Sequence, residues 1–267
     1  MFIMHPLNGP RLKIRRAESE IQALRRADES FMKDSEYHIV KAEFNPKTGK
    51  YVYRVRTSSE PPDPEWGVWI GEIAHNLRSA LDSLVYQLAL LGTKTPASNT
   101  QFPIFLVGKT TRKHMPHFEG MELRDGRSMI RQLLPKHQAL IERLQPYKRS
   151  RGGRKNPLYW LKEVNNADKH RLIQVVGAKV GVGPVVGGWV DTVKYPFDIS
   201  HPSILKDGAK IGEAPTDMGV GPKVFPLVAF WKGCEAVKGL GVCYTLRRIA
   251  EHIAEIVESF GPEFLPA

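Results

Sequence analysis

The chain is poor in cysteine and has no long apolar run. Its 267 residues include two cysteines, Cys234 and Cys243, which form neither a disulfide framework nor a metal-ligand spacing. Two free thiols suit a reducing compartment, and we interpret both as small apolar side chains. The longest apolar stretch lies around residues 84–92 and is far too short to cross a membrane. The sequence therefore predicts a cytoplasmic protein with no membrane contact.

Signals for export, for a metal ion and for a cofactor are also lacking. The N-terminal apolar stretch is too short for a signal peptide, since His5, Pro6 and Gly9 interrupt it. His114 and His117 flank a Met-Pro pair, which prevents a helical pair of metal ligands. No phosphate-binding loop or dinucleotide-binding motif has its full pattern. We therefore expect neither a metal nor a cofactor.

Positive charge is abundant instead. The formal net charge is +11, and residues 109–155 hold 13 basic against 4 acidic side chains, which leaves +9 in this segment. A concentrated basic segment attracts polyanions such as nucleic acid, although a merely solvated surface has the same composition. We therefore expect RNA or DNA as a partner. The candidate contacts are Lys148, Arg149, Arg151, Arg154 and Lys155, in a loop that contains glycine.

Helical periodicity recurs along the chain. Apolar residues spaced three and four positions apart are typical of amphipathic helices. They predict helices at residues 11–33, 65–91, 127–145, 157–171 and 240–260. Asn156 and Pro157 are expected to open the fourth helix as its N-cap and first helical residue. Pro135 is expected to restart the third.

Strand signals lie in two stretches. The alternating runs on either side of residues 45–49 predict a β-hairpin within residues 37–57. A second hairpin is expected at residues 204–212, with Asp207 and Gly208 at its turn. Further strands are expected at residues 102–107, 173–182, 188–197 and 223–231.

These elements predict an α+β fold class. The expected architecture is a helical bundle with a mainly antiparallel β-sheet inserted before the C-terminal helix. No internal repeat is visible, so we expect a single domain over residues 1–267. Its helical parts are about 11–34, 65–171 and 240–260, and its β-rich parts are about 37–57 and 172–232.

The helix expected over residues 65–91 carries an unusual polar face. A long solvated face is usually rich in Lys and Glu, whereas this one holds side chains suited to specific hydrogen bonding. The i, i+3, i+4 and i+7 spacings bring such side chains together. The face consists of Glu72, His75, Asn76, Ser79, Asp82, Ser83 and Tyr86, with Arg78 on its flank.

The helix expected over residues 157–171 shows a sharper signal. Asn165 and Asp168 fall within its apolar face, and Arg171 lies near the edge. A carboxylate at such a position is costly unless it is paired and hydrogen-bonded. We therefore expect a cation from another element to approach Asp168.

Arg78 is the first candidate for the partner of Asp168, and His75 is the second. Such a constellation is either a buried polar network that fixes helix register, a ligand or anion site, or a catalytic site. A sealed, fully hydrogen-bonded network favours the first reading, and an open cleft favours a site. The candidate residues are His75, Asn76, Arg78, Asp82, Asn165, Asp168, His170 and Arg171.

Two strings on these helices carry a resemblance. HNLRSALDSLVYQLA, at residues 75–89, and NNADKHRLI, at residues 165–173, resemble strings in a family of uncharacterised bacterial and phage-associated proteins. The resemblance runs from about residue 65 to the C-terminal helix. It implies a shared fold, and that family has no established activity to carry over.

The helical part also resembles the HEPN superfamily, helical bundles that include RNases of toxin and antiphage systems. The hallmark of that group is an Arg followed after four to six residues by a His on a late helix. Arg247 and His252 have this spacing, although Arg248 stands where a small or polar residue is typical. The alternative reading of the pair is a solvated helix face interleaved with Glu251 and Glu255.

The HEPN resemblance implies metal-independent RNA cleavage. In that chemistry a histidine moves the 2′-hydroxyl proton and an arginine stabilises the charged phosphorane. HEPN nucleases usually pair two such motifs across a dimer, so a homodimer is expected with it. The leading interpretation is thus a protein that contacts nucleic acid and is a HEPN-like RNase. The alternative is a non-catalytic interaction or structural protein whose polar helix pair is a buried network.

Overall fold

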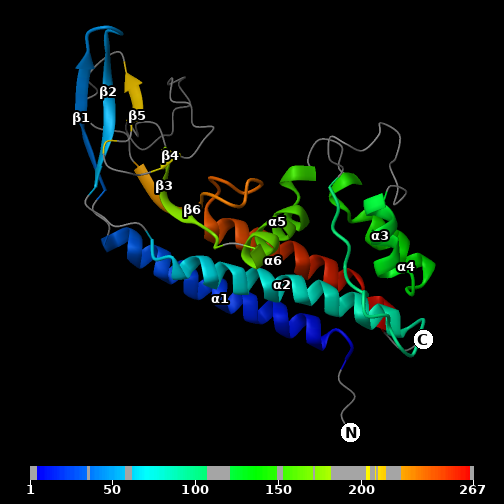
Figure 1. Cartoon of the computed structure of the whole chain (residues 1–267). Coiled ribbons are helices and arrows are strands. Elements are labelled where there is room, and N and C mark those ends of the chain that lie inside the picture. Colours follow the sequence, from blue (N-terminus) through cyan, green and yellow to red (C-terminus); the bar gives the residue numbers. More distant parts are fainter. Residues whose placement is uncertain are drawn as a thin grey trace.

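The computed structural model of the chain confirms the expected fold class (Figure 1). Within the described residues it is α+β, with six α-helices and two three-stranded antiparallel sheets. The described residues are 5–34, 37–57, 62–106, 121–148, 153–170, 172–181, 203–204, 208, 210–214 and 224–264.

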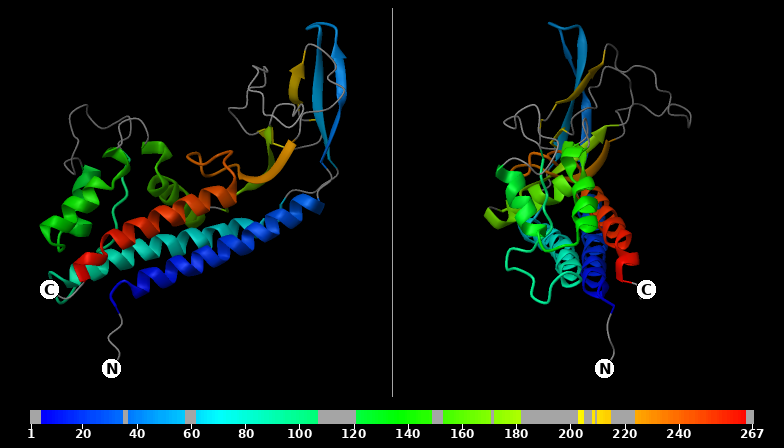
Figure 2. Two further views of the ribbon diagram at one scale, coloured as in Figure 1. Left: turned by 180° about the vertical axis from the view of Figure 1, so that it is seen from behind. Right: turned by 90° about the vertical axis from the view of Figure 1, so that its right-hand side faces the viewer.

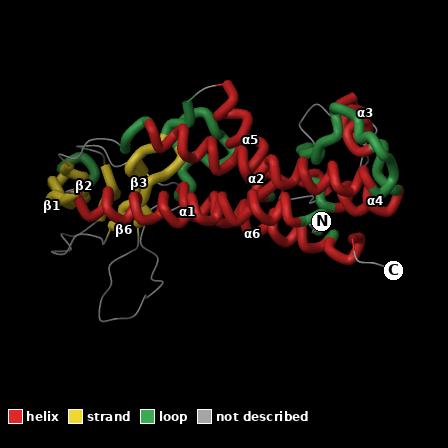
Figure 3. Tube along the Cα trace, turned by 90° about the horizontal axis from the view of Figure 1, so that it is seen from below, coloured by secondary structure: helices red, strands yellow, loops and turns green. Residues whose placement is uncertain are grey.

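Four helices form the bundle: α1 (Asn8–Asp34), α2 (Glu65–Leu90), α5 (Pro157–His170) and α6 (Val242–Ser259). All four lie close to the expected ranges. Each of α1, α5 and α6 packs against α2, and α6 also packs against α1 and α5. From below, α1, α2 and α6 run along a common direction, with the strands at one end and α3 and α4 at the other (Figure 3).

The helices α1 and α2 are antiparallel partners. At one end the rings of Phe31 and Trp66 meet edge to face, with centroids 5.8 Å apart. At the other end Gly9 lies beside the hydroxyl of Ser83. Between them the indole N–H of Trp69 donates to Glu20 at 2.7 Å. The pair is therefore a helical hairpin whose connection contains strands β1 and β2.

The core lies where the four helices face one another. Burial follows the expected apolar periodicity, which explains why these segments form helices whose one side faces inward. Among the helices that the structure describes, none combines the length and apolar character that a membrane crossing requires. The largest fully buried side chains of this core include Leu24, Ile70, Ile73, Leu77, Leu81, Leu84, Leu88 and Phe260.

The expected helix over residues 127–145 is two helices. One is α3 (Met121–Ile130), which begins six residues before the expected start, and the other is α4 (Pro135–Arg143). Pro135 is the first residue of α4, as expected, because a proline there lacks only an N–H that the first turn leaves unpaired. Short 3₁₀ turns follow at Pro146–Lys148, Gly153–Lys155 and, after α6, at Gly261–Phe264.

One sheet joins strands that lie far apart in the sequence. The expected hairpin, β1 (Tyr37–Asn45) and β2 (Lys50–Thr57), is confirmed, and its turn contains Gly49 with a φ of 67°. The third strand is β5 (Lys210–Ala214), which pairs with β2. This sheet stands off the end of the bundle (Figure 2).

The second sheet connects α5 to α6. Its order is β4 (Ser203–Ile204), β3 (Val175–Gly181) and β6 (Val224–Phe230). The sheet inserted before the last helix is therefore confirmed, as are the strands expected at residues 173–182 and 223–231. The strand expected at residues 188–197 lies outside the described residues.

Two strand expectations are wrong. Residues 204–212 do not form a hairpin with paired arms, because β4 pairs with β3 whereas β5 pairs with β2, so the segments around Gly208 join different sheets. Residues 102–106 of the strand expected at 102–107 form no strand. Their polar backbone groups bond to side chains instead of to a neighbouring strand, as described below.

Two glycines let α2 approach the α5 end of the chain closely. A Cβ atom on Gly67 would lie 2.3 Å from the carbonyl oxygen of Ile173, just beyond α5. A Cβ atom on Gly71 would lie 1.9 Å from an oxygen of Asp168. Residues four apart share one helix face, so these glycines form a continuous flat contact.

This contact shows that the expected pair of Asp168 and Arg78 is wrong. Asp168 lies over Gly71, seven residues before Arg78, which is about 10 Å along the helix. Arg78 pairs with Asp82 instead, with 2.9 Å between Nη2 and Oδ1. Asp168 is exposed, so water solvates its carboxylate, and among the described residues it has no ion-pair partner.

We predict that alanine at the two glycines changes the free energy of unfolding by different amounts. Gly67→Ala should lower the free energy of unfolding by about 1–3 kcal/mol, because the backbone at Ile173 must move. Gly71→Ala should change it by less than about 1 kcal/mol, because the exposed Asp168 side chain can rotate away and alanine favours the helix. Urea unfolding of both variants measures the difference. Equal losses would show that the contact at Ile173 is no tighter than the one at Asp168.

Candidate functional site

A groove lies between the first and last helices. The helices α1 and α6 are antiparallel, and at one end Arg11 Nε and Nη2 donate to the two carboxylate oxygens of Glu258, at 2.7 and 2.6 Å. The hydrogen bond from Arg11 lowers the pKa of Glu258. Towards the other end the helices enclose a cavity of about 290 Å³. We call it the α1–α6 groove, lined by Ile21, Gln22, Arg25, Asp28, Glu29, Cys243, Tyr244 and Arg247.

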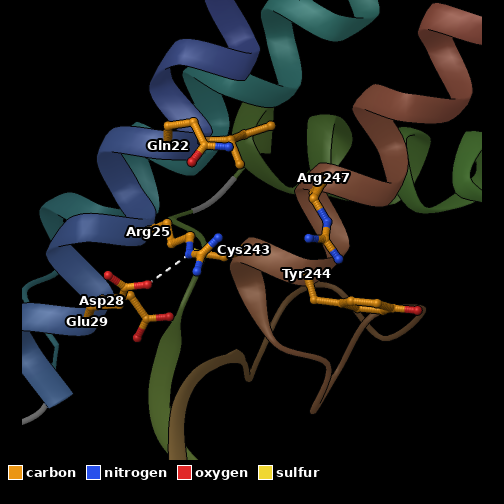
Figure 4. Close-up of a pocket in the computed structure, with 8 residues that line it drawn as sticks. Gln22, Arg25, Asp28, Glu29, Cys243, Tyr244 and Arg247 are labelled. Carbon is orange, nitrogen blue, oxygen red and sulfur yellow. Dashed lines mark hydrogen bonds and ion pairs between the residues drawn. The ribbon is translucent and has the colours of Figure 1, made fainter.

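Two guanidinium groups and an aromatic ring line this groove. Arg25 comes from α1, whereas Tyr244 and Arg247 come from α6, one turn apart (Figure 4). The Tyr244 residue is 53% exposed and the Arg247 side chain is 55% exposed. Arg25 Nε lies 2.8 Å from Glu29 Oε1 on its own helix, and Arg247 Nε lies 3.6 Å from Glu251. Each cation thus has a carboxylate neighbour but stays accessible to water.

The inner wall of the groove holds a carboxyl group and a thiol. Asp28 accepts a hydrogen bond from the backbone N–H of Val228 at 3.3 Å, and the Cys243 thiol shares the inner wall with it. Burial raises the pKa of Asp28. Burial, together with the charge of the nearby Asp28, raises the pKa of Cys243 to about 12. The thiol therefore stays protonated at neutral pH and is a poor nucleophile.

Arg78 and Asp82, two residues of the expected polar constellation, hold the chain at Phe102. Besides its pair with Asp82, Arg78 Nη2 donates to the Phe102 carbonyl oxygen at 2.6 Å. The Phe102 N–H donates to Asp82 Oδ1 at 2.9 Å. Both backbone polar groups of a buried residue are thus satisfied by side chains, which explains why this segment needs no partner strand. These contacts favour a structural role for Arg78 and Asp82.

A buried glutamine continues this arrangement. Gln145 Nε2 donates to the carbonyl oxygen of Pro103 at 2.8 Å, and its Oε1 accepts from the Phe105 N–H at 3.1 Å. Gln145 is fully buried just after α4. The segment at residues 101–106 is therefore held between α2 and the turn after α4. Sequence reasoning missed Gln145, because its partners lie about 40 residues away.

Among the described residues, no hydrogen bond or ion pair joins the other members of the polar constellation to one another. His75, Asp168 and His170 are exposed, and Asn76 is half-buried. Asn165 is buried, and its side-chain oxygen has no hydrogen-bond partner among the described residues. Arg171 lies outside the described residues. The helices α2 and α5, which carry the described members of this constellation, pack against each other.

The Arg-His pair on α6 is divided between two environments. Arg247 lines the α1–α6 groove, whereas His252 lies further along the helix and does not line it. The His252 side chain is 17% exposed, and its Nδ1 lies 3.4 Å from Glu255 Oε2. The groove thus contains one of the two residues that the HEPN resemblance singles out.

The expected basic contacts are described in part. Lys148 lies 3.1 Å from Glu142 and stacks over the Tyr147 ring at 5.4 Å. Arg154 and Lys155 are exposed. Arg149 and Arg151 lie outside the described residues.

Sequence reasoning missed the residues that face Arg247. Arg25 and Gln22 belong to a helix more than 200 residues away in the chain, and only the antiparallel packing of α1 on α6 brings them close. Tyr244 carried a weak signal, since it lies one turn before Arg247 on the polar side of an amphipathic helix. In the part of the chain that the structure describes, no group of His, Cys, Asp or Glu side chains has the arrangement of a metal site.

Comparison with protein-family models, with curated proteins and with solved structures finds no match to this chain.

We predict that Asp28→Asn makes Cys243 easier to alkylate. Asp28 disfavours the thiolate through its charge, so its neutral isostere should lower the thiol pKa. At any pH below that pKa, a lower value means more thiolate and a faster reaction. The initial rate with iodoacetamide at about pH 8 measures this in a Cys234→Ala background. An unchanged rate, with both proteins folded, would contradict the coupling.

Proposed function

We propose that the protein contacts single-stranded nucleic acid through the α1–α6 groove. The observation that carries the proposal is that an exposed aromatic residue, Tyr244, and the guanidinium groups of Arg25 and Arg247 line the same groove. Aromatic rings stack on unpaired bases, and arginines bind backbone phosphates, in sites for single strands. A base inside a duplex is already stacked on both faces, so an exposed ring favours a single strand.

A phosphate group can replace the carboxylates that pair with the arginines of the groove. Arg25 bonds to Glu29, and Arg247 lies near Glu251, but these are exposed pairs on helix surfaces. Such pairs contribute only about 0–1 kcal/mol each, so a phosphate can replace the carboxylate at little cost. The volume of about 290 Å³ is near the lower end of ligand pockets, which suits one nucleotide unit.

The charge of the whole chain supports the same partner. A net charge of +11 attracts polyanions over long range and raises the rate at which they associate. Lys148, Arg154 and Lys155 would add sequence-independent phosphate contacts. The cytoplasm is a reducing compartment, so it suits a protein whose two cysteines form no disulfide.

We predict that Arg247→Ala weakens binding of labelled single-stranded RNA about tenfold, because one charge-assisted contact is lost. It should also reduce the slope of log Kd against log salt by roughly one. The matched control is Arg248→Ala, since that residue is equally exposed and pairs with the same Glu251 but does not line the groove. Tyr244→Ala should also weaken binding, whereas Tyr244→Phe keeps the ring and should not. Fluorescence anisotropy at low and physiological salt measures all four.

Two outcomes would contradict this proposal. Equal effects of Arg247→Ala and Arg248→Ala would indicate a diffuse electrostatic contact without a site. If wild-type protein binds no RNA or DNA even at low salt, nucleic acid is excluded as its partner. The second result favours the alternative function, a non-catalytic interaction protein.

Metal-independent RNA cleavage is the second candidate function, and two observations favour it. Arg247 lines the groove with an exposed guanidinium group, which is available to a bound phosphate. On the same helix Glu255 lies beside one ring nitrogen of His252, and a carboxylate in that place orients a histidine that acts as a base. The homodimer implied by the HEPN resemblance would bring two such helices to one RNA.

We predict that His252→Ala abolishes RNA cleavage in buffer containing EDTA but leaves RNA binding nearly unchanged. Because the His252 side chain is only 17% exposed, its truncation should also lower the melting temperature. His75→Ala, which removes an exposed histidine outside the groove, is the control. Cleavage per protomer should rise with protein concentration if the dimer is required. Wild-type protein that binds RNA but never cleaves it leaves the binding function and rejects the nuclease.

A further inference from the structure

Two aromatic rings stand at the tip of the β1–β2 hairpin. Phe44 and Tyr51 are directly paired across the strands, and their ring centroids lie 5.2 Å apart. Phe44 is 55% exposed, which makes it the most exposed of the large hydrophobic residues that the structure describes. The hairpin tip projects away from the helical bundle (Figure 1).

The other face of the same hairpin is covered at Val52, whereas its cross-strand neighbour Glu43 is exposed. Val52 follows Tyr51, so its side chain points to the opposite face of the strand, and it is only 7% exposed. In an antiparallel sheet with one covered face, the open face is normally polar. Here the open face carries Phe44 and Tyr51. An exposed Phe44 ring, packed against the half-buried Tyr51 ring on the face that normally carries polar residues, calls for a partner with flat apolar surfaces.

The charge of the hairpin indicates which partner that is. Residues 37–57 contain five basic side chains against one acidic side chain, a net charge of +4. Lys47 and Lys50, at the turn beside the rings, are both exposed. Aromatic rings flanked by cations match the bases and phosphates of a nucleic acid strand.

We propose that the β1–β2 tip is a second contact for the strand held in the α1–α6 groove, with a base stacked on Phe44 and phosphates beside Lys47 and Lys50. This inference rests on the proposed function, because it concerns the same ligand. It adds a footprint: the ligand extends from the groove along the hairpin to its tip.

The fold gives that footprint a length. Arg25, Asp28 and Glu29 lie near the end of α1, and about 9 Å of helix separate Asp28 from the last residue, Asp34. The nine residues of β1 then span about 30 Å to the tip. A stacked strand advances about 3.4 Å per nucleotide, so roughly 12 nucleotides cover this path.

The experiment compares two oligouridines, of about 4 and about 20 nucleotides, which fall on either side of that length. Anisotropy with the full chain gives the Kd of each. Phe44→Ala should weaken binding of the long oligomer about tenfold and leave the short one unchanged. Phe44→Tyr, which keeps a ring, should bind both as wild type does. Leu12→Ala removes an equally exposed apolar side chain from α1 and serves as the control.

The outcomes separate this inference from the proposed function. If the long oligomer binds the Phe44→Ala variant as tightly as wild type, the inference is overturned, but the proposed contact in the groove is not affected. The groove is excluded as the binding site if the short oligomer does not bind wild-type protein, or if Arg247→Ala leaves the Kd of the short oligomer unchanged. If circular dichroism shows that Phe44→Ala loses strand content, the double variant Lys47→Ala/Lys50→Ala is used to test the inference instead, because it keeps the ring pair. That variant should weaken the long oligomer alone, and equal binding would again overturn the inference.

Discussion

The close packing of three helices against α2 is the constraint on which the rest of the structure depends. A helix contacted by α1, α5 and α6 must be apolar around much of its circumference, and α2 is. It must also offer a flat surface where the chain after α5 crosses it, which Gly67 and Gly71 provide. With α2 in this position, α1 and α6 lie antiparallel along its side, and the groove is the space that their outer edges leave.

The polar groups of α2 have a consequence for the loops. Arg78 and Asp82 lie beside the covered face and satisfy both backbone groups of Phe102. Together with Gln145 they replace the hydrogen bonds that a neighbouring strand would give to an extended segment. The segment at residues 101–106 is thereby fixed across the bundle without a sheet. This is the structural reading of the polar helix face, and it leaves the α1–α6 groove as the better candidate for binding.

The sequence predicted local structure well and long-range partners poorly. The bundle helices and the β1–β2 hairpin have strong periodic or turn signals, and Asn156 caps α5 as expected through a 2.8 Å bond to the Leu158 N–H. The helix that carries Asp168 was predicted correctly, but the residues of α2 that face Asp168 were not. Close contact at Gly67 and Gly71 sets how α5 and the chain after it lie against α2, and apolar periodicity holds no information about such contacts. The pairing of β5 with β2 joins segments about 160 residues apart, which no local pattern encodes. For the same reason Arg247 was identified as a candidate, whereas Arg25, from the far end of the chain, was not.

The central claim is that nucleic acid lies in the groove between α1 and α6 rather than on the basic segment at large. Photo-crosslinking of a thiouridine-substituted single-stranded RNA, followed by peptide mapping by mass spectrometry, tests this most directly. The groove account predicts crosslinks to residues 22–29 and 243–247, with Tyr244 prominent among them. Crosslinks confined to residues 148–155, or spread evenly over the surface, would contradict it.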